Sequence, residues 1–216
     1  MSVVALVIVG SMMGLATGWW TPNLVRWGLA DATVNAPRTV VIPIGIVIGA
    51  GIAILVGPSV VVLAWWWFGL AALVVSCADL ARHRLPDRLV VPFGVGGFAC
   101  FLVAAAFLGA WGDLLRATIA AFLVGLIFVI LSMMAAGGMG MGDVKLSPVM
   151  GCYLGWLGWE SVFIGVLAGF VVGALVAIVR VLMSTGSLSQ RMGMRVPFGP
   201  SMLAGVAIAA GLPGVI

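Results

Sequence analysis

The chain has 216 residues, of which 64% are hydrophobic and only 7% are charged. A soluble domain carries roughly 25% charged residues, so this composition excludes a soluble globular protein and indicates a chain embedded in a lipid bilayer. The formal net charge of +4 rests on ten Lys and Arg residues against six acids. Because the basic residues form no run or patch, we expect no nucleic-acid partner.

The apolar segments predict an all-α fold, a polytopic membrane bundle of about eight transmembrane helices. A helix needs about 20 apolar residues to cross the hydrocarbon layer, with a range of about 17 to 25. The sixth candidate is short and rich in glycine, so we expect it to cross at a tilt or only in part. The eight candidate spans are residues 3–20, 39–57, 59–78, 89–110, 116–136, 146–158, 161–180 and 199–215.

The basic residues predict the orientation of these spans. Eight crossings place the connections 21–38, 79–88, 137–145 and 181–198 on one side of the membrane. That side, with Arg180 at its edge, carries nine of the ten basic residues, and the other side carries only Arg116. Basic residues in short connections remain in the cytosol, so this side is predicted to be cytosolic. Indoles favour the interface near span ends, where the candidates are Trp19, Trp20, Trp27, Trp111, Trp156 and Trp159.

The connections are too short to hold a soluble domain, so residues 1–216 are expected to form a single integral-membrane domain. The three cysteines, Cys77, Cys100 and Cys152, all lie inside apolar segments, and no two have C-x-x-C spacing. We therefore predict buried thiols and no metal site.

Two of the six acids lie at span ends on the predicted cytosolic side. Asp79 ends the third span and Asp143 begins the sixth, whereas Asp31, Asp87 and the two acids of the opposite side are expected to be solvated charges of connections. An ionisable residue at membrane depth is costly and is usually functional. Two adjacent carboxylates do not both ionise readily, so one can act as a base while the other donates a hydrogen bond. The pair is therefore a candidate aspartic-protease site.

Glycines precede Asp143 in the stretch GGMGMGDVK, residues 137–145. Glycine weakens a helix and exposes backbone N–H and C=O groups, so Gly140 and Gly142 could bind an extended substrate chain where the backbone lines a wet cavity. Close packing between helices is the alternative explanation for these glycines.

Two further side chains near the aspartates in sequence have candidate roles. Lys145 is either an interface anchor or a counter-charge for a nearby carboxylate. His83 lies between Arg82 and Arg84, which disfavour a general base, so we expect a solvated side chain in a connection.

Three elements of the chain resemble the type IV prepilin peptidase family of G-x-G-D intramembrane aspartic proteases. Residues 140–146, GMGDVKL, match its GxGDxK motif. Ala78-Asp79, followed by RLPDRL at 84–89, is similar to its first-aspartate segment. Pro197, Phe198 and Gly199 lie in VPFGP, which resembles its (I/V)PFGP element, so the three resemblances together cover about residues 70–200.

The resemblance implies that Asp79 and Asp143 are the catalytic pair and that no cofactor is needed. It implies a prepilin or pseudopilin substrate, with a short basic leader before an apolar helix, cut at the cytosolic membrane face. The location implied is the bacterial inner membrane, with the product used by a type IV pilus or type II secretion machine. The oligomeric state does not follow from the sequence.

The chain departs from the longer members of that family. Those members carry a cytosolic zinc domain with two C-x-x-C pairs between the first two spans and also methylate the new N-terminus. The corresponding segment here is TPNLVRWGLADATVNAPRT, residues 21–39, which has no cysteine. We therefore predict no zinc domain and do not expect N-methyltransferase activity.

Two other functions remain open from the residues alone. Acids within a membrane bundle also occur in transporters and proton relays, for which an acid at mid-membrane and an internal repeat are expected. A catalytically silent relative would keep the motifs without the reaction.

Overall fold

The computed structural model describes residues 2–34, 36–83, 85–134, 140–183 and 198–212. Those residues form eight helices and no strand. Six of them are long and apolar enough to cross a membrane, and the two shorter helices are α6 and α9. The helices are α1 (Val3–Leu29), α2 (Arg38–Val56), α3 (Val62–Arg82), α4 (Asp87–Leu108), α5 (Trp111–Met134), α6 (Met141–Leu157), α7 (Trp159–Met183) and α9 (Gly199–Ala210).

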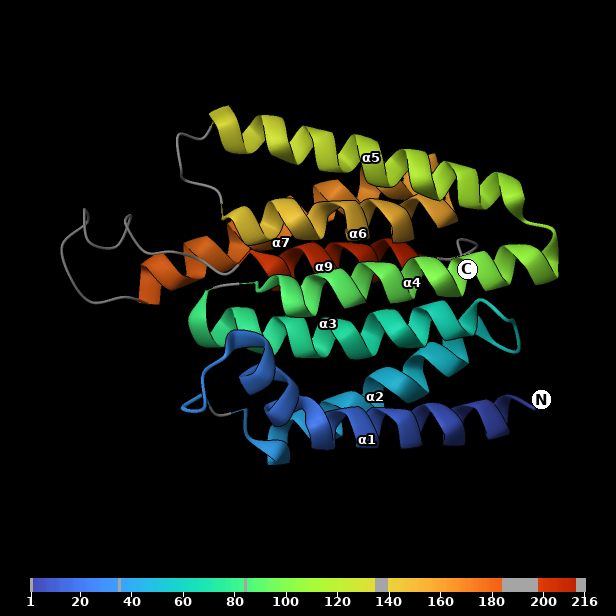
Figure 1. Cartoon of the computed structure of the whole chain (residues 1–216), viewed down its shortest axis with the longest axis horizontal. Helices are drawn as coiled ribbons and strands as arrows, with labels where there is room; N and C mark the ends of the chain where they lie inside the picture. Colours follow the sequence, from blue (N-terminus) through green and yellow to red (C-terminus); the bar gives the residue numbers. More distant parts are fainter. Residues whose placement is uncertain (1, 35, 84, 135–139, 184–197, 213–216) are drawn as a thin grey trace.

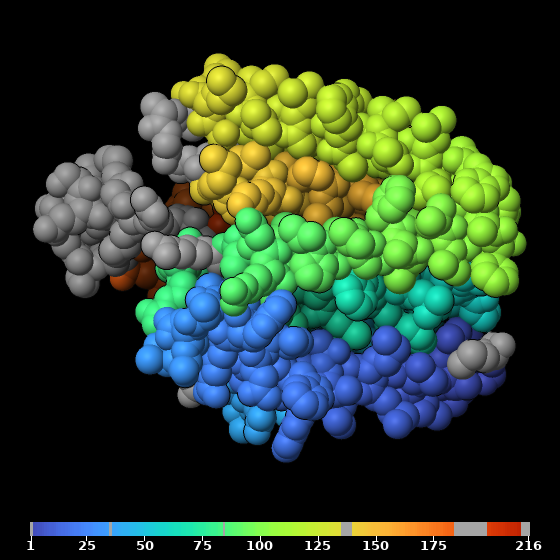
Figure 2. All heavy atoms as spheres, in the orientation of Figure 1, coloured from blue at the N-terminus to red at the C-terminus, as the bar shows by residue number. Residues whose placement is uncertain are grey.

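The polytopic helical membrane bundle predicted from composition is confirmed. Successive helices run in alternating directions, so α1 begins and α9 ends on the same side of the molecule (Figure 1). Figure 2 shows one face, with α1 and α5 at opposite edges and α4 and α6 between them. Large apolar side chains point outward along the bundle, with Phe107 and Phe163 77% and 82% exposed, as expected for a surface in contact with lipid.

One end of the bundle collects the basic side chains. The ends of α1 and α3 and the starts of α2, α4, α6 and α9 lie there, and we call it the basic end. Of the described basic residues, only Arg116, in the second turn of α5, lies at the opposite end. The basic end holds Arg26, Arg38, Arg82, Arg88, Lys145 and Arg180.

The predicted C-terminal end of the first span was wrong. The sequence predicts residues 3–20, but α1 continues to Leu29. Pro22 lies inside the helix, where its ring removes one backbone donor, and the last turns of α1 leave the direction of the first (Figure 1). The helix ends only at Ala30, whose positive φ of 51° is the usual left-handed termination. Half of the predicted connection 21–38 is therefore helical.

Trp156, which Arg116 contacts through its carbonyl, differs from expectation. Arg116 donates from Nε to the Gly155 carbonyl at 2.7 Å and from Nη2 to the Trp156 carbonyl at 2.8 Å. A cation on the last carbonyls of a helix stabilises its C-terminus. Trp156 is buried and its ring stacks on Phe101 at 4.5 Å, so it belongs to the core and not to the membrane interface.

An aromatic cluster fixes α6 against α3 and α4. Tyr153 is its centre, with ring centroids 4.8 Å from Phe68 and 4.9 Å from Phe101. The buried Tyr153 hydroxyl donates to the Ala64 carbonyl of α3 at 3.0 Å, so this polar atom is satisfied inside the core. These contacts set the height of α6 relative to α3.

Helices α1 and α2 meet through glycines. A Cβ added at Gly49 would lie 1.9 Å from the Gly10 carbonyl oxygen, so only glycine permits this approach. On the same helix, a Cβ at Gly51 would meet nothing within 4 Å.

We predict that alanine substitutions at these two glycines change the stability of the protein in opposite directions. Gly51→Ala is expected to raise helix stability by about 0.5–1 kcal/mol, because alanine loses less backbone entropy. Gly49→Ala is expected to lower stability, because α1 and α2 must separate. Thermal unfolding of the two variants in one detergent measures the difference. Equal melting temperatures would show that the close approach does not hold the pair together.

Candidate active site

Asp79 lies in the last turn of α3, at the basic end. Its side chain is buried, with 4% of its surface exposed. The helix ends just beyond it because His83 adopts a left-handed φ of 51° and Pro86 follows. The exposed His83 caps the helix through its backbone N–H, which donates to the Asp79 carbonyl at 2.7 Å.

The start of α9 binds the Asp79 carboxylate. The backbone N–H of Gly199 donates to Asp79 Oδ2 at 3.1 Å across 120 residues of sequence. The first N–H groups of a helix have no partner within it and carry the positive end of its dipole, so they favour an anionic group. A Cβ at Gly199 would lie 2.9 Å from the same oxygen. The glycine of VPFGP therefore lets the backbone approach the carboxylate.

Phe198 holds the start of α9 in this position. Its ring lies 5.4 Å from the ring of Phe170 on α7. A Cβ at Gly173 of α7 would come within 2.4 Å of the Phe198 ring, so the ring fits against a helix surface without a side chain. Pro197 lies outside the described residues.

Asp143 lies in the first turn of α6, whose N-cap is Gly140. Gly140 is extended, with φ −64° and ψ 131°, and its carbonyl accepts from the Asp143 backbone N–H at 3.1 Å. The Asp143 carboxylate turns back toward Gly140, because a Cβ there would lie 3.0 Å from Asp143 Oδ2. Asp143 is partly buried, and its neighbour Gly142 packs on Leu85, whose side chain also approaches Gly199 beside Asp79. The two predicted residues therefore share one site at the basic end.

Leu85 joins the three elements, and its position was not predicted. This residue of the α3–α4 connection is buried. A Cβ at Gly142 would lie 2.7 Å from Leu85 Cβ, and one at Gly199 would lie 3.3 Å from Leu85 Cδ1. The starts of α6 and α9 thus pack on opposite parts of one side chain beside Asp79. The only sequence feature pointing to Leu85 is its place in the RLPDRL element.

Lys145 does not pair with either aspartate of the site. Its Nζ donates to Asp87 Oδ1, in the first turn of α4, at 2.6 Å. The two side chains are 46% and 63% exposed, so Asp87 is an ion-pair partner and not simply the solvated charge that was expected. The pair links the starts of α4 and α6 at the surface.

We predict that removing this ion pair changes the stability of the protein only slightly. Exposed pairs contribute about 0.2–1 kcal/mol, so Lys145→Met and Asp87→Asn should each change stability by no more than about 1 kcal/mol. A double-mutant cycle on thermal stability isolates their coupling. A loss of cleavage in Lys145→Met that Asp87→Asn does not share would instead indicate that Lys145 acts on the site itself.

Asp31 is a second acid that was expected to be solvated and is paired. The Thr33 hydroxyl and backbone N–H donate to Asp31 Oδ1 at 2.6 and 2.9 Å, and Arg82 forms an ion pair with Oδ2. The Thr33 hydrogen bonds, followed by Arg82, lower the pKa of Asp31 from its usual value. These bonds attach the connection after α1 to the last turn of α3, three residues from Asp79.

A helical bundle with six candidate membrane spans and two aspartates together at one end defines a polytopic membrane protein with a candidate aspartic site. The model of the type IV leader peptidase family matches residues 63–178, more than half of the chain. The chain therefore belongs to the type IV leader peptidase family.

Curated relatives agree with this family. A prepilin leader peptidase/N-methyltransferase of Burkholderia pseudomallei is 32% identical over 168 residues, which cover 74% of this chain and 50% of the relative. A protein of the same name from Aeromonas hydrophila is 33% identical over 147 residues, or 64% of this chain and 48% of the relative. The chain thus spans about half the length of the curated relatives it matches. No solved structure gives a significant match.

Proposed function

We propose that this chain is an intramembrane aspartic endopeptidase that removes the basic leader from type IV prepilins or pseudopilins. The observation that supports the proposal is the hydrogen bond from Gly199 N–H to Asp79 at the end of the bundle where α6, with Asp143 in its first turn, packs on Leu85. Family membership supplies the substrate class. We further propose that residues 1–216 act as one membrane domain in the bacterial inner membrane, with the basic end in the cytosol.

The two aspartates take different roles in this proposal. Asp79 receives a hydrogen bond from Gly199 N–H, which favours its charged form. We assign the shared proton to Asp143, because the Gly199 hydrogen bond already favours the charged form of Asp79. Asp79 takes a proton from water, and the water oxygen attacks the carbonyl carbon of the scissile peptide bond. Asp143 donates a hydrogen bond to the developing oxyanion, and the amine leaves with a proton from Asp79.

The test is cleavage of candidate prepilins by the purified protein in detergent. We expect one cut between the basic leader and the apolar helix, identified by the masses of both products. A prepilin whose leader lysines and arginines are replaced by serine is the control for leader recognition. Intact prepilin after incubation with folded protein would favour the catalytically silent relative.

The paired aspartates predict a bell-shaped pH dependence. A reaction that needs one ionised and one protonated carboxyl loses rate at low pH, where both hold protons, and at high pH, where both are ionised. Initial rates of cleavage measured across this range, with thermal stability checked at each pH, test the expectation. A rate that stays flat from acidic to strongly basic pH contradicts a dyad that shares one proton.

A further inference from the structure

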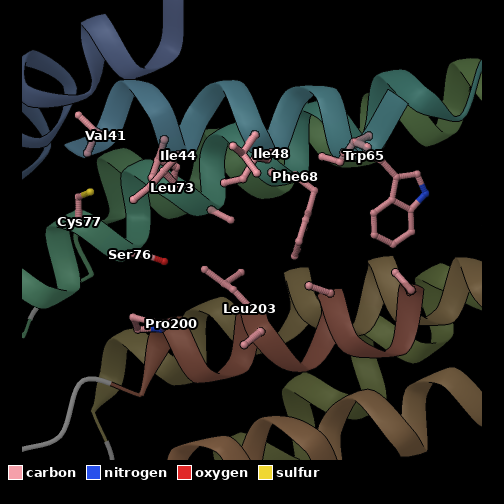
Figure 3. Close-up of a pocket in the computed structure, with 18 of the residues that line it drawn as sticks. Val41, Ile44, Ile48, Trp65, Phe68, Leu73, Ser76, Cys77, Pro200 and Leu203 are labelled. Carbon is pink, nitrogen blue, oxygen red and sulfur yellow. The ribbon is translucent and has the colours of Figure 1, made fainter. Parts of the chain in front are cut away.

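A groove of about 760 Å³ lies between α2 and α9, with α3 as its floor. Figure 3 shows α2 and α3 on one side of the space and α9 on the other, with Ser76 and Leu203 between them. We call it the α2–α9 groove. The functional site described above does not account for it.

The lining of the α2–α9 groove is apolar and uncharged. Small residues line the floor of the groove, at Gly69 and Ala72 of α3, and its α9 wall, at Ala204 and Ala207. Small side chains let a helix backbone approach closely, which is how helices associate inside a bilayer. The lining therefore suits an apolar helix packed by close contact.

The groove is long enough for a membrane-spanning helix and reachable from the lipid. From Trp65 to Ala81, the lining residues of α3 rise by about 24 Å, most of the roughly 30 Å hydrocarbon layer. Val47 and Leu55 of α2 line the groove and are 70% and 62% exposed. A helix lying in the bilayer can therefore enter from the side.

The groove leads to the candidate active site. Its lining residues Trp65, Phe68, Ala72 and Ser76 are spaced three or four residues apart along α3, and Asp79 continues the same spacing. These residues therefore share one face of the helix. On α9, the lining begins at Pro200, directly after the glycine that bonds Asp79.

Two polar groups in the groove have no hydrogen-bond partner among the described residues. Trp65 is 3% exposed and its indole N–H is unbonded. The Ser76 hydroxyl lies one turn from Asp79 and its oxygen points into the space between α3 and α9 (Figure 3). An extended peptide beside Asp79 has free carbonyl groups that could accept from the Ser76 hydroxyl, whereas a hydrocarbon chain could not.

We propose that the α2–α9 groove is the docking site for the apolar helix of the prepilin substrate. This inference rests on the proposed function and adds where the substrate lies. The substrate helix packs on α3 and α9 with its N-terminal end at the basic end. The chain before that helix then passes Ser76 and reaches Asp79 and Asp143. Docking along the groove fixes the cleavage site by position, because the peptide bond at the end of the helix meets the aspartates.

Disulfide cross-linking in membranes tests the position and direction of the docked helix. The enzyme carries Asp79→Asn to retain uncut substrate and one cysteine, at native Cys77, Val47→Cys or Leu55→Cys, with the remaining native cysteines replaced by alanine. The co-expressed prepilin carries one cysteine at successive positions of its apolar helix. Cys77 should cross-link nearest the scissile bond, and the maximum for Leu55→Cys should lie about eight residues beyond that for Val47→Cys.

Val95→Cys is the matched control, because this residue of α4 is 65% exposed and does not line the groove. It should give no cross-link. Equal cross-linking at Val95→Cys, or maxima that do not shift from Val47→Cys to Leu55→Cys, would overturn the proposal.

Filling the groove tests its use in cleavage. Ala207 lines the groove and is exposed, so Ala207→Trp should raise KM for full-length prepilin about tenfold. A short peptide that spans the scissile bond but lacks the apolar helix should be cut as by the wild type. Ile208→Trp is the control, because Ile208 lies on the same helix, is 45% exposed and does not line the groove.

The outcomes separate this inference from the proposed function. If the wild type cuts no prepilin, the proposed function fails. If the wild type and Ala207→Trp cut prepilin equally well, only the docking site is overturned. Loss of a co-purified lipid in Ala207→Trp with cleavage unchanged also overturns it and makes the groove a lipid site.

Discussion

Leader cleavage is expected to fall by about a thousandfold or more when either Asp79 or Asp143 is replaced by asparagine. Asparagine keeps the size of the side chain. In place of Asp79 it can neither take a proton from water nor give one to the leaving amine, and in place of Asp143 it cannot supply the acidic O–H that the proposed reaction needs; general acid–base catalysis contributes about 10²–10⁴-fold. The double variant should be no slower than the slower single variant, because the two carboxyls act as a unit. Cleavage of a co-expressed prepilin, followed by the size of the product, measures the loss.

The matched controls are Asp31→Asn and Asp87→Asn, which remove carboxylates from the same end of the bundle. Both acids are paired at the surface, so these variants should keep most of the cleavage activity. Each variant must accumulate in the membrane at the wild-type level. Full cleavage by Asp79→Asn or by Asp143→Asn would remove the basis for the proposed reaction.

The second large loss of cleavage activity is expected when Gly199 is replaced by alanine. An alanine there would place its Cβ 2.9 Å from Asp79 Oδ2 and 3.3 Å from Leu85 Cδ1, so the carboxylate must move away from the backbone N–H that it accepts from. A misplacement of about 1 Å in a reacting group lowers the rate by about 100-fold, and the shift needed here is smaller. We expect Gly199→Ala to reduce kcat by about 10- to 100-fold with little change in KM.

The pH profile distinguishes loss of this hydrogen bond from general damage to the fold. Without the Gly199 donor, the charged form of Asp79 is less favoured, so the acidic limb of the pH–rate profile should move to higher pH. Gly112→Ala is the control, because a Cβ at Gly112 meets nothing within 4 Å. A lower rate with an unmoved acidic limb would mean that Gly199 only supports the packing of α9.

The sequence predicts those features of the fold that depend on local composition. Apolar length identified the helices, and alternation of the helices then brought Asp79 and Asp143 to one end, as expected. Helix ends were less predictable, because hydrophobicity measures contact with lipid and not backbone termination. Residues 21–29 are less apolar than the span before them, yet α1 continues through Pro22 until Ala30 takes a left-handed conformation.

Contacts between distant segments could not be predicted. The bond from Gly199 to Asp79 crosses 120 residues, and the packing of Leu85 against Gly142 and Gly199 depends on the relative heights of three helices. Lys145 shows the same limit, because the sequence suggested an interface anchor or a counter-charge without identifying the carboxylate, and its partner is Asp87 at the start of another helix. The resemblance to the family identified the candidate site residues but not the contacts between their atoms.

The hydrogen bond between Tyr153 and Ala64 determines the alignment of the candidate site from a distance. Tyr153 lies ten residues along α6 from Asp143, about 15 Å away, and Ala64 lies about 22 Å along α3 from Asp79. Sliding one helix past the other by a single turn would break this bond and separate the two carboxyls by about 5.4 Å more. The alignment of the two aspartates therefore depends on the relative height of α3 and α6, which contacts deep in the core hold in place.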